Sequence, residues 1–417
     1  MKMNEQQFAL IKEQLRKLTS QECFYKHKLE GINVDDIKSQ EDFEKLPFTW
    51  KGDLRDAYPL GLQAVPDEEI VRIHSSSGTT GTPVIIPYTK KDVEDWAIMF
   101  ERCYRMAGIT NMDRIQITPG YGLWTAGIGF QLGCERLGAM AIPMGPGNTD
   151  KQLKMMVDMQ STVLCATSSY ALLLAEEIAK RGISDKIKLK KGIIGSERWG
   201  EKMRDRISKE LGIELYDIYG LTEVYGPGIG VSCGEHNGIH VWDDYLYFEI
   251  VDPVTGENLP DGEVGELVIT TLKKQGAPLI RFRTHDLTRI IPGKCVCGCE
   301  RPRIDTIFGR TDDMVKVKGV NIFPMQVEKV LVQFPELGSN YLITLETISN
   351  QDEMIVEVEL SDLSTDNYIE LEKVRKAISR RLKDEILVTP KVKLVKKGSL
   401  PQSEGKAVRV KDLRDNK

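Results

Sequence analysis

At residues 74–83 the chain reads His74-Ser75-Ser76-Ser77-Gly78-Thr79-Thr80-Gly81-Thr82-Pro83. Gly78 and Gly81 let the backbone turn tightly and bring N–H groups close to an anion, while the hydroxyl groups add donors without bulk. The stretch is therefore a candidate phosphate-binding loop. It is not a Walker A loop, because no lysine followed by Ser or Thr comes after its second glycine. An ordinary surface turn of similar composition is the alternative.

Two short apolar runs flank this loop. Ile70-Val71-Arg72-Ile73 precedes it, and Val84-Ile85-Ile86-Pro87-Tyr88 follows it. Runs of this length and composition are typical of strands, so the loop is predicted to join two β segments as a hairpin-like turn. A helix is predicted next, from about residue 91 to residue 106.

Short apolar runs alternate with helical patterns between residues 137 and 220. Strands are predicted at 139–143, 163–166, 191–195 and 214–219, with helices near 149–159, 168–182 and 199–210. Such repetition is typical of parallel βαβ units, in which ligands gather at the carboxyl ends of the strands. We therefore expect Ser196-Glu197 and Tyr219-Gly220-Leu221-Thr222-Glu223 to lie where a ligand binds.

The pattern changes after residue 246. Strands at 247–251, 265–270 and 288–291, separated by turn signals, predict a small antiparallel β subdomain. Beyond residue 309 a strand pair around Gly319, helices at 324–334 and 367–383, and strands at 353–360 and 391–396 form a separate α+β module. The predicted fold class is α/β, with a large N-terminal domain over 1–311 and a smaller C-terminal α+β domain over 312–417.

The bulk composition excludes several classes of protein. The chain has 417 residues, of which 41% are hydrophobic and 29% are charged, and its net charge is −5 without a long basic run. Nucleic acid is therefore not an expected partner. The N-terminus lacks the pattern of a signal peptide, and no run approaches the roughly 18 apolar residues of a membrane span. We expect a cytoplasmic protein without a membrane partner.

A glycine-rich stretch interleaves small residues with large apolar ones. It reads Pro119-Gly120-Tyr121-Gly122-Leu123-Trp124-Thr125-Ala126-Gly127-Ile128-Gly129. Aromatic side chains offer rigid faces and glycines leave room, so this stretch could line a slot for a flat apolar group. Close packing of a helix at its Gly and Ala positions is the alternative.

The cysteines suggest a metal site. Three of the eight are crowded into Cys295-Val296-Cys297-Gly298-Cys299, which in a reducing compartment favours a metal over a disulfide. Structural Zn²⁺ takes four N or S ligands. Cys233 and His240 would complete a site with Cys295 and Cys297 if both segments flank the same β subdomain. Cys299 and His236 are further candidate ligands. Free thiols without a metal are the alternative.

Five motifs occur in the order seen in adenylate-forming acyl-CoA synthetases, which the chain resembles over nearly its whole length. They are residues 75–83 and 219–223 above, Arg281-Phe282-Arg283-Thr284-His285-Asp286, Gly309-Arg310-Thr311-Asp312-Asp313 and Gly405-Lys406. Within that superfamily the chain is similar to the phenylacetate–CoA ligase branch. That likeness rests on Lys45-Leu46-Pro47-Phe48-Thr49-Trp50-Lys51-Gly52-Asp53-Leu54-Arg55, Gly238-Ile239-His240-Val241-Trp242-Asp243-Asp244 and Lys318-Gly319-Val320-Asn321-Ile322-Phe323-Pro324.

The resemblance implies a reaction in two halves. A carboxylate attacks the α-phosphorus of Mg²⁺-bound ATP to form an acyl-AMP, and the acyl group then passes to the thiol of coenzyme A. The loop at 75–80 would hold phosphates, and Thr222 and Glu223 would sit at the α-phosphate and Mg²⁺. The remaining nucleotide contacts that the resemblance implies are Tyr219-Gly220 on adenine, Asp217 and Ser196-Glu197 at the adenine edge, Asp286 on both ribose hydroxyls, and Arg310 near the ribose and phosphate.

The resemblance also implies a C-terminal domain that rotates about Asp312. Lys406 would bind the acyl phosphate in one orientation, and Lys318-Gly319 would line the passage for CoA in the other. Without the resemblance, Asp312 would be a linker acid and Lys406 a surface lysine. The chain departs from many relatives in lacking a lysine in the phosphate loop, where Thr82 and Val84 stand nearby. This departure leaves open how firmly the loop holds the β- and γ-phosphates.

The predicted protein is an ATP-dependent aryl-acid–CoA ligase, with phenylacetate as the first candidate. The candidate acyl-pocket residues are Tyr121, Gly122, Leu123, Trp124 and Gly127, together with His240 in a role that rivals metal binding. Benzoate, hydroxylated phenylacetates and indoleacetate are alternative acids, because a methylene or hydroxyl changes discrimination by only about 1–3 kcal/mol. An acceptor other than CoA is a second hypothesis, and a non-catalytic nucleotide-binding or zinc-stabilised module is a third. A homodimer is suggested by the family alone.

Overall fold

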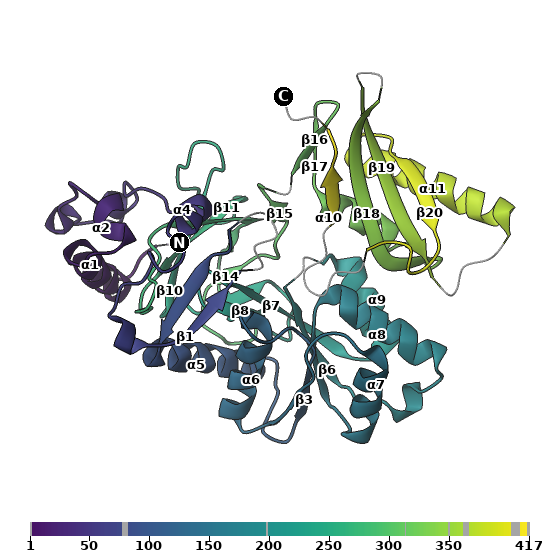
Figure 1. Ribbon diagram of the computed structural model, residues 1–417, viewed down its shortest axis with the longest axis horizontal. Helices are drawn as coiled ribbons and strands as arrows, with labels where there is room; N and C mark the ends of the chain where they lie inside the picture. The colour runs from purple at the N-terminus through teal and green to yellow at the C-terminus, as the bar shows by residue number, and fades with distance from the viewer. Residues whose placement is uncertain are drawn as a thin grey trace. The chain divides into compact units, whose positions relative to one another are not determined.

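The computed structural model describes residues 2–76, 82–196, 199–312, 314–348, 351–361, 367–401 and 409–414 (Figure 1). The chain forms two compact units. Unit 1 comprises Met1–Gly145, Ser161–Cys165 and Tyr216–Phe308, and unit 2 comprises Pro146–Gln160, Ala166–Leu215 and Gly309–Lys417. No helix among the described residues is long and apolar enough to cross a membrane.

Unit 1 begins with a helical segment. Helix α1 (Glu5–Ser20) starts with a capping box at Asn4 and buries Ile11, Leu15 and Leu18. These side chains join an apolar cluster that includes Tyr247, a residue of a later strand, and Ile280. Three short helices follow: α2 (Phe24–Lys28), α3 (Gln40–Phe43) and α4 (Lys51–Asp56).

The predicted hairpin around the candidate phosphate loop is confirmed. Strands β1 (Ile70–Ser75) and β2 (Ile85–Thr89) pair antiparallel, with Ser75 opposite Ile85. Helix α5 (Lys90–Met106) follows directly and has a capping box between Thr89 and Asp92. Residues 77–81 of the loop lie outside the described residues.

Parallel strands are present where the alternating pattern predicts them. Strand β3 (Arg114–Ile117) pairs in parallel with β4 (Met140–Pro143) and with β5 (Val163–Ala166). Helix α6 (Thr125–Leu137) connects β3 and β4. Its glycines pack tightly, since a Cβ at Gly129 or Gly133 would come within 2.7 Å of the Phe100 side chain. The alternative of close helix packing therefore holds for this part of the glycine-rich stretch.

A run of antiparallel strands follows. Strand β7 (Glu214–Leu221) pairs with β8 (Gly226–Ser232), β8 with β9 (Ile239–Val241), β9 with β14 (Arg303–Ile304), and β14 with β13 (Ile290–Ile291). The sequence pattern did not predict β8 or β9. It also ended β7 too early, because the strand continues to Leu221 and so contains Tyr219 and Gly220.

The antiparallel β subdomain is confirmed with one corrected boundary. Strands β10 (Leu246–Val251), β11 (Gly265–Thr271) and β12 (Phe282–Thr288) pair in that order. The strand expected at 288–291 falls on two strands: Thr288 ends β12, and Ile290–Ile291 form β13, which pairs with β14 in the other sheet. Buried ion pairs hold the residues at the start of β12. Arg281 pairs with Glu249 at 3.0 Å, and Arg283 pairs with Glu266 at 2.5 Å.

Unit 2 contains two groups of elements. The first consists of α7 (Thr149–Asp158), α8 (Ser168–Lys180), β6 (Lys191–Gly195) and α9 (Glu201–Leu211). The second consists of β15 (Gly309–Arg310), β16 (Val315–Val317), β17 (Val320–Ile322), α10 (Pro324–Leu331), β18 (Leu337–Ile348), β19 (Gln351–Leu360), α11 (Tyr368–Ile386), β20 (Lys391–Val395) and β21 (Val410–Asp412).

The second group is the predicted α+β module. Its sheet has the order β20-β19-β18-β21, and α10 and α11 pack together over an apolar core that includes Ile343, Val356 and Ile378 (Figure 1). The predicted hairpin at Gly319 is β16–β17. The sequence pattern missed the twelve-residue strand β18.

Candidate active site

Glu223 is a buried carboxylate just beyond the end of β7. The residue is 5% exposed, and its Oε1 lies 2.9 Å from the ammonium nitrogen of Lys51. A buried carboxylate is stable in its charged form only with a compensating partner. Glu223 is therefore held as an anion, and its oxygens are hard ligands of the kind that Mg²⁺ prefers.

Lys51 reaches Glu223 because the segment before it is fastened to β12. Thr49 donates its N–H to the carbonyl of Arg281 at 3.0 Å and accepts the N–H of Arg283 at 2.9 Å. The Trp50 ring then lies 4.4 Å from the guanidinium of Arg283. Sequence reasoning quoted Lys51 within a branch motif and gave it no role. The missing lysine of the phosphate loop was the signal that could have prompted a search for a cation elsewhere.

The candidate acyl segment meets both the phosphate loop and the Thr222 motif. The Thr222 hydroxyl lies 3.2 Å from that of Thr125, the first residue of α6. The carbonyl of Leu123 accepts the N–H of Ser75 at 2.8 Å. The start of the phosphate loop, the candidate acyl segment and the Thr222 motif were predicted to share a site. These contacts bring the three together within unit 1.

The individual acyl-pocket candidates are placed differently from one another. Tyr121 is half-buried, and a Cβ at Gly127 would lie 2.7 Å from its ring, so this glycine leaves room for the tyrosine. Gly122 has a φ of +84°, which only a glycine adopts readily. Leu123 and Trp124 are 51% and 46% exposed. The acyl-pocket assignment stays a prediction.

Tyr219 and Asp286 form a direct hydrogen bond. The Tyr219 hydroxyl donates to Oδ2 of Asp286 at 2.7 Å, and both residues are buried. This bond orients the carboxylate, and a carboxylate offers two oxygens of the kind that accept hydrogen bonds from a diol. Asp217 on the same strand donates its N–H to the Ser232 hydroxyl at 2.9 Å. Gly220 is required sterically, because a Cβ there would lie 2.1 Å from the carbonyl oxygen of Gly226.

Other candidates lie in unit 2. Ser196 follows β6 with a φ of +67°. Arg310 makes a two-pronged ion pair with Asp312, both N–O distances being 2.7 Å. Lys318 and Gly319, with φ of +50° and +83°, form the turn between β16 and β17. Some candidates fall outside the described residues: Ser77, Gly78, Thr79, Thr80, Glu197 and Lys406.

The four predicted metal ligands converge. The ligand atoms of Cys233, His240, Cys295 and Cys297 all lie within 4.8 Å of one another. The sulfurs of Cys233 and Cys295 are 3.8 Å apart, and Nε2 of His240 is 3.4 Å from the sulfur of Cys297. The other ring nitrogen of His240 lies 3.1 Å from the carbonyl oxygen of Arg301. These contacts favour a metal role for His240 over an acyl-pocket role.

The reserve candidates lie outside this cluster. Cys299 directs its backbone N–H to the sulfur of Cys297 at 3.4 Å, while its own side chain is not part of the cluster. The His236 ring faces Tyr216, with 5.6 Å between centroids.

A buried lysine lies behind the Thr222–Glu223 motif. The Lys274 ammonium donates to the carbonyl of Val224, and its nitrogen lies 4.1 and 4.4 Å from the ring centres of Tyr88 and Tyr225. Burial lowers the pKa of Lys274 to about 7, against the opposing charge of Asp92. Sequence reasoning did not identify this residue, because nothing in its local pattern marks it as buried.

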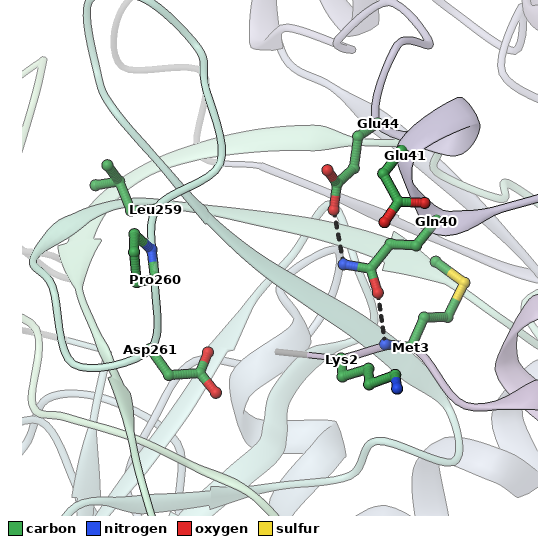
Figure 2. Close-up of a pocket in the computed structure, with 8 residues that line it drawn as sticks. All are labelled: Lys2, Met3, Gln40, Glu41, Glu44, Leu259, Pro260 and Asp261. Atoms are coloured by element: carbon green, nitrogen blue, oxygen red, sulfur yellow. Dashed lines mark hydrogen bonds between the residues drawn. The ribbon is translucent and has the colours of Figure 1, made fainter.

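A cavity lies elsewhere in unit 1. Its volume is about 550 Å³. Figure 2 shows its lining residues, which come from the N-terminal segment, the α3 segment and the loop at 259–261. Gln40 spans one side of it, accepting the N–H of Met3 at 2.8 Å and donating to Glu44 at 2.7 Å. Its lining contains none of the candidate site residues, so this cavity is not the candidate active site.

Comparison with known proteins identifies the family of this chain. A family model for AMP-binding enzymes matches residues 9–272, and one for the AMP-binding enzyme C-terminal domain matches residues 319–414. The phenylacetate-coenzyme A ligase of Pseudomonas putida is 44% identical over 389 residues, which cover 92% of this chain and 88% of that protein. The chain belongs to the phenylacetate-coenzyme A ligase family.

Other members and neighbours extend this likeness. The family member from Thermus thermophilus is 41% identical over 428 residues, covering 97% of this chain and 96% of that protein. The crystal structure of 2-hydroxyisobutyryl-CoA ligase with R3-HIB-AMP is 28% identical, with a TM-score of 0.89 over 97% of this chain and 88% of that one. The predicted fold and reaction class, an AMP-forming acid–CoA ligase that uses ATP and CoA, are confirmed.

Replacing Lys274 with Met should remove a pH dependence of stability. The pKa of Lys274 is about 7 in the folded protein and 10.5 as its ordinary value. Between these values the unfolded chain binds the extra proton, so the free energy of unfolding should rise with pH across that window. Urea titrations at pH 7 and pH 9 measure the rise.

The half-buried neighbour Lys273 supplies the control. In Lys273→Met the free energy of unfolding should still rise between pH 7 and pH 9. In Lys274→Met this rise should be absent. An identical pH dependence in wild type and Lys274→Met would contradict the assignment of the shifted pKa to this amine.

Proposed function

We propose that this protein ligates an arylacetic acid, with phenylacetate as the first candidate, to coenzyme A through an acyl-AMP, releasing AMP and diphosphate. The observation that carries the proposal is the 3.2 Å approach of Thr222 to Thr125. It sets the motif proposed for the α-phosphate beside the segment that bears Tyr121 and Trp124. Phenylacetate-coenzyme A ligases at 41–44% identity support this choice of acid.

In the adenylation step, the chain would hold ATP at several points. Asp286, steadied by Tyr219, would accept hydrogen bonds from the ribose hydroxyls, and Glu223 would hold Mg²⁺. The ion would offset the charge of the phosphates during attack by the carboxylate. Lys406 would bind the acyl-phosphate oxygens, where charge accumulates in the transition state.

In the thioester step, the turn at Lys318 and Gly319 would line the path of the CoA thiol. Its two positive φ angles make the turn tight, and no atom lies within 4 Å of where a Cβ of Gly319 would stand. This leaves the backbone open to the close approach of a slender chain such as pantetheine.

An acid panel tests the proposed function. AMP release would be measured with ATP, Mg²⁺ and CoA and with phenylacetate, benzoate, indoleacetate, a hydroxyphenylacetate or hexanoate. Phenylacetate should give the highest kcat/KM, and hexanoate should fall below it by at least about tenfold, since a flat slot loses contact with a flexible chain. Equal rates with phenylacetate and hexanoate would contradict the arylacetate assignment, and AMP release that does not require CoA would favour another acceptor.

We also propose that Cys233, His240, Cys295 and Cys297 bind a structural Zn²⁺. A tetrahedral site with Zn–S bonds of about 2.3 Å separates two sulfur ligands by about 3.8 Å, and the Cys233–Cys295 distance is 3.8 Å. The bond from His240 to the carbonyl of Arg301 would orient the ring for binding through Nε2. Bound there, Zn²⁺ would tie the start of the 233–240 segment to the turn at 295–297.

Metal analysis of the purified protein tests this site. Wild type should contain one zinc per chain, and Cys297→Ser should lose it, because the thiolate is a ligand. Cys299→Ser is the matched control in the same turn and should keep the metal. Zinc-free wild type, or equal loss from both variants, would contradict the proposed ligand set.

A further inference from the structure

The contact between Lys51 and Glu223 joins a partly exposed cation to a buried anion. The Lys51 side chain is 31% exposed and that of Glu223 is 6% exposed, with 2.9 Å between the charged atoms. The ammonium thus stands at the solvent side of the carboxylate that is proposed to hold Mg²⁺. A polyanion arriving from solvent would meet this cation at the point where the metal is needed.

The position of Lys51 is set by a rigid support. Thr49 is completely buried, and its hydroxyl donates to the carbonyl of Ile280 at 2.7 Å and lies 2.9 Å from the Tyr25 hydroxyl. Its backbone is hydrogen-bonded to β12, the strand that carries Asp286. On the other side, Asp53 accepts the N–H of Trp50 at 2.8 Å and the ammonium of Lys28 at 2.6 Å. Lys51 is therefore anchored to the strand that is proposed to bind the ribose.

The neighbouring cations on this side of unit 1 serve other partners. Lys274 is buried against the carbonyl of Val224, and Arg281 and Arg283 are held by buried Glu249 and Glu266. The stretch at 74–83 contains no lysine or arginine. Transfer of a nucleotidyl group requires fixed positive charge near the phosphates. Lys51 differs from these cations in two ways: it is paired with Glu223, and its side chain is partly exposed to solvent.

We propose that Lys51 is a phosphate-binding residue of the adenylation step. In the free protein its ammonium neutralises Glu223. With Mg²⁺ and ATP bound, Glu223 would hold the metal, and the Lys51 ammonium would bind a non-bridging oxygen of the triphosphate. Lys51 thereby supplies from α4 the charge that the phosphate loop lacks. This inference rests on the proposed function, in which Glu223 is a ligand of Mg²⁺.

Calorimetry with a non-hydrolysable ATP analogue, α,β-methylene-ATP, and Mg²⁺ tests the proposal. Lys51→Met should raise the dissociation constant at least about tenfold, and should lower kcat/KM for ATP in AMP release about 100-fold, as loss of one charge-stabilising group does. The KM for the acid at saturating ATP should stay unchanged. Lys51→Arg, which keeps the charge, should recover part of the affinity.

Lys45→Met is the matched control. Lys45 lies in the same segment but pairs with Asp42 in solvent, its side chain being 74% exposed. Its removal should leave the affinity for the analogue within twofold of wild type. An unchanged affinity in Lys51→Met would overturn the proposal and leave Lys51 as a counter-ion of Glu223 alone.

A second pair of variants separates phosphate binding from charge balance and does not depend on the folding of Lys51→Met. In Glu223→Gln the buried charge is gone, so Lys51 has no carboxylate to neutralise. If Lys51 binds phosphate, Glu223→Gln/Lys51→Met should bind the analogue more weakly than Glu223→Gln. Equal affinities would overturn the proposal. Tight analogue binding by wild type without AMP release from any acid would instead count against the proposed function.

Discussion

The candidate site depends on the burial of one charged carboxylate. Glu223 is almost completely removed from water and has the Lys51 ammonium 2.9 Å away. Charge in such a place is unfavourable unless it is compensated, so the surrounding chain must deliver a cation to a fixed point. The Thr49 contacts with β12 serve this requirement, because they position Lys51 beside Glu223. The same compensation leaves Glu223 anionic and ready for a divalent cation.

Strand β12 connects the parts of this arrangement. Its start is held by Glu249 and Glu266 through Arg281 and Arg283, and its middle presents Asp286 to Tyr219. Buried ion pairs of this kind add little net stability, but breaking one leaves a buried charge, so they specify position more than they strengthen the fold. Thr49, which is hydrogen-bonded to Arg281 and Arg283, fixes the position of Lys51 two residues later in the chain. Strand β12 and its partners therefore position Asp286 and Lys51, two groups of unit 1 that are proposed to bind the nucleotide.

The local sequence pattern and the order of motifs predicted many of the strands and site residues. They failed where contacts between residues far apart in the sequence determine the structure. Short apolar runs correctly marked β4 and β5, and the crowded cysteines led to the His240 cluster. Strand β8 was missed because its Gly226-Pro227-Gly228 start resembles a turn. Phe100 explains that composition, since a Cβ at Gly228 would lie 2.6 Å from its ring. Lys51 and Lys274 were missed because their roles come from contacts with residues far away in the sequence.

The central claim is that the acyl group is activated on AMP before CoA takes part. Exchange of labelled diphosphate into ATP, measured with phenylacetate and Mg²⁺ in the absence of CoA, tests this claim most directly. The account predicts exchange that requires the acid and proceeds without CoA, because the contacts proposed for adenylation form without the thiol. Exchange that occurs only when CoA is present would contradict it.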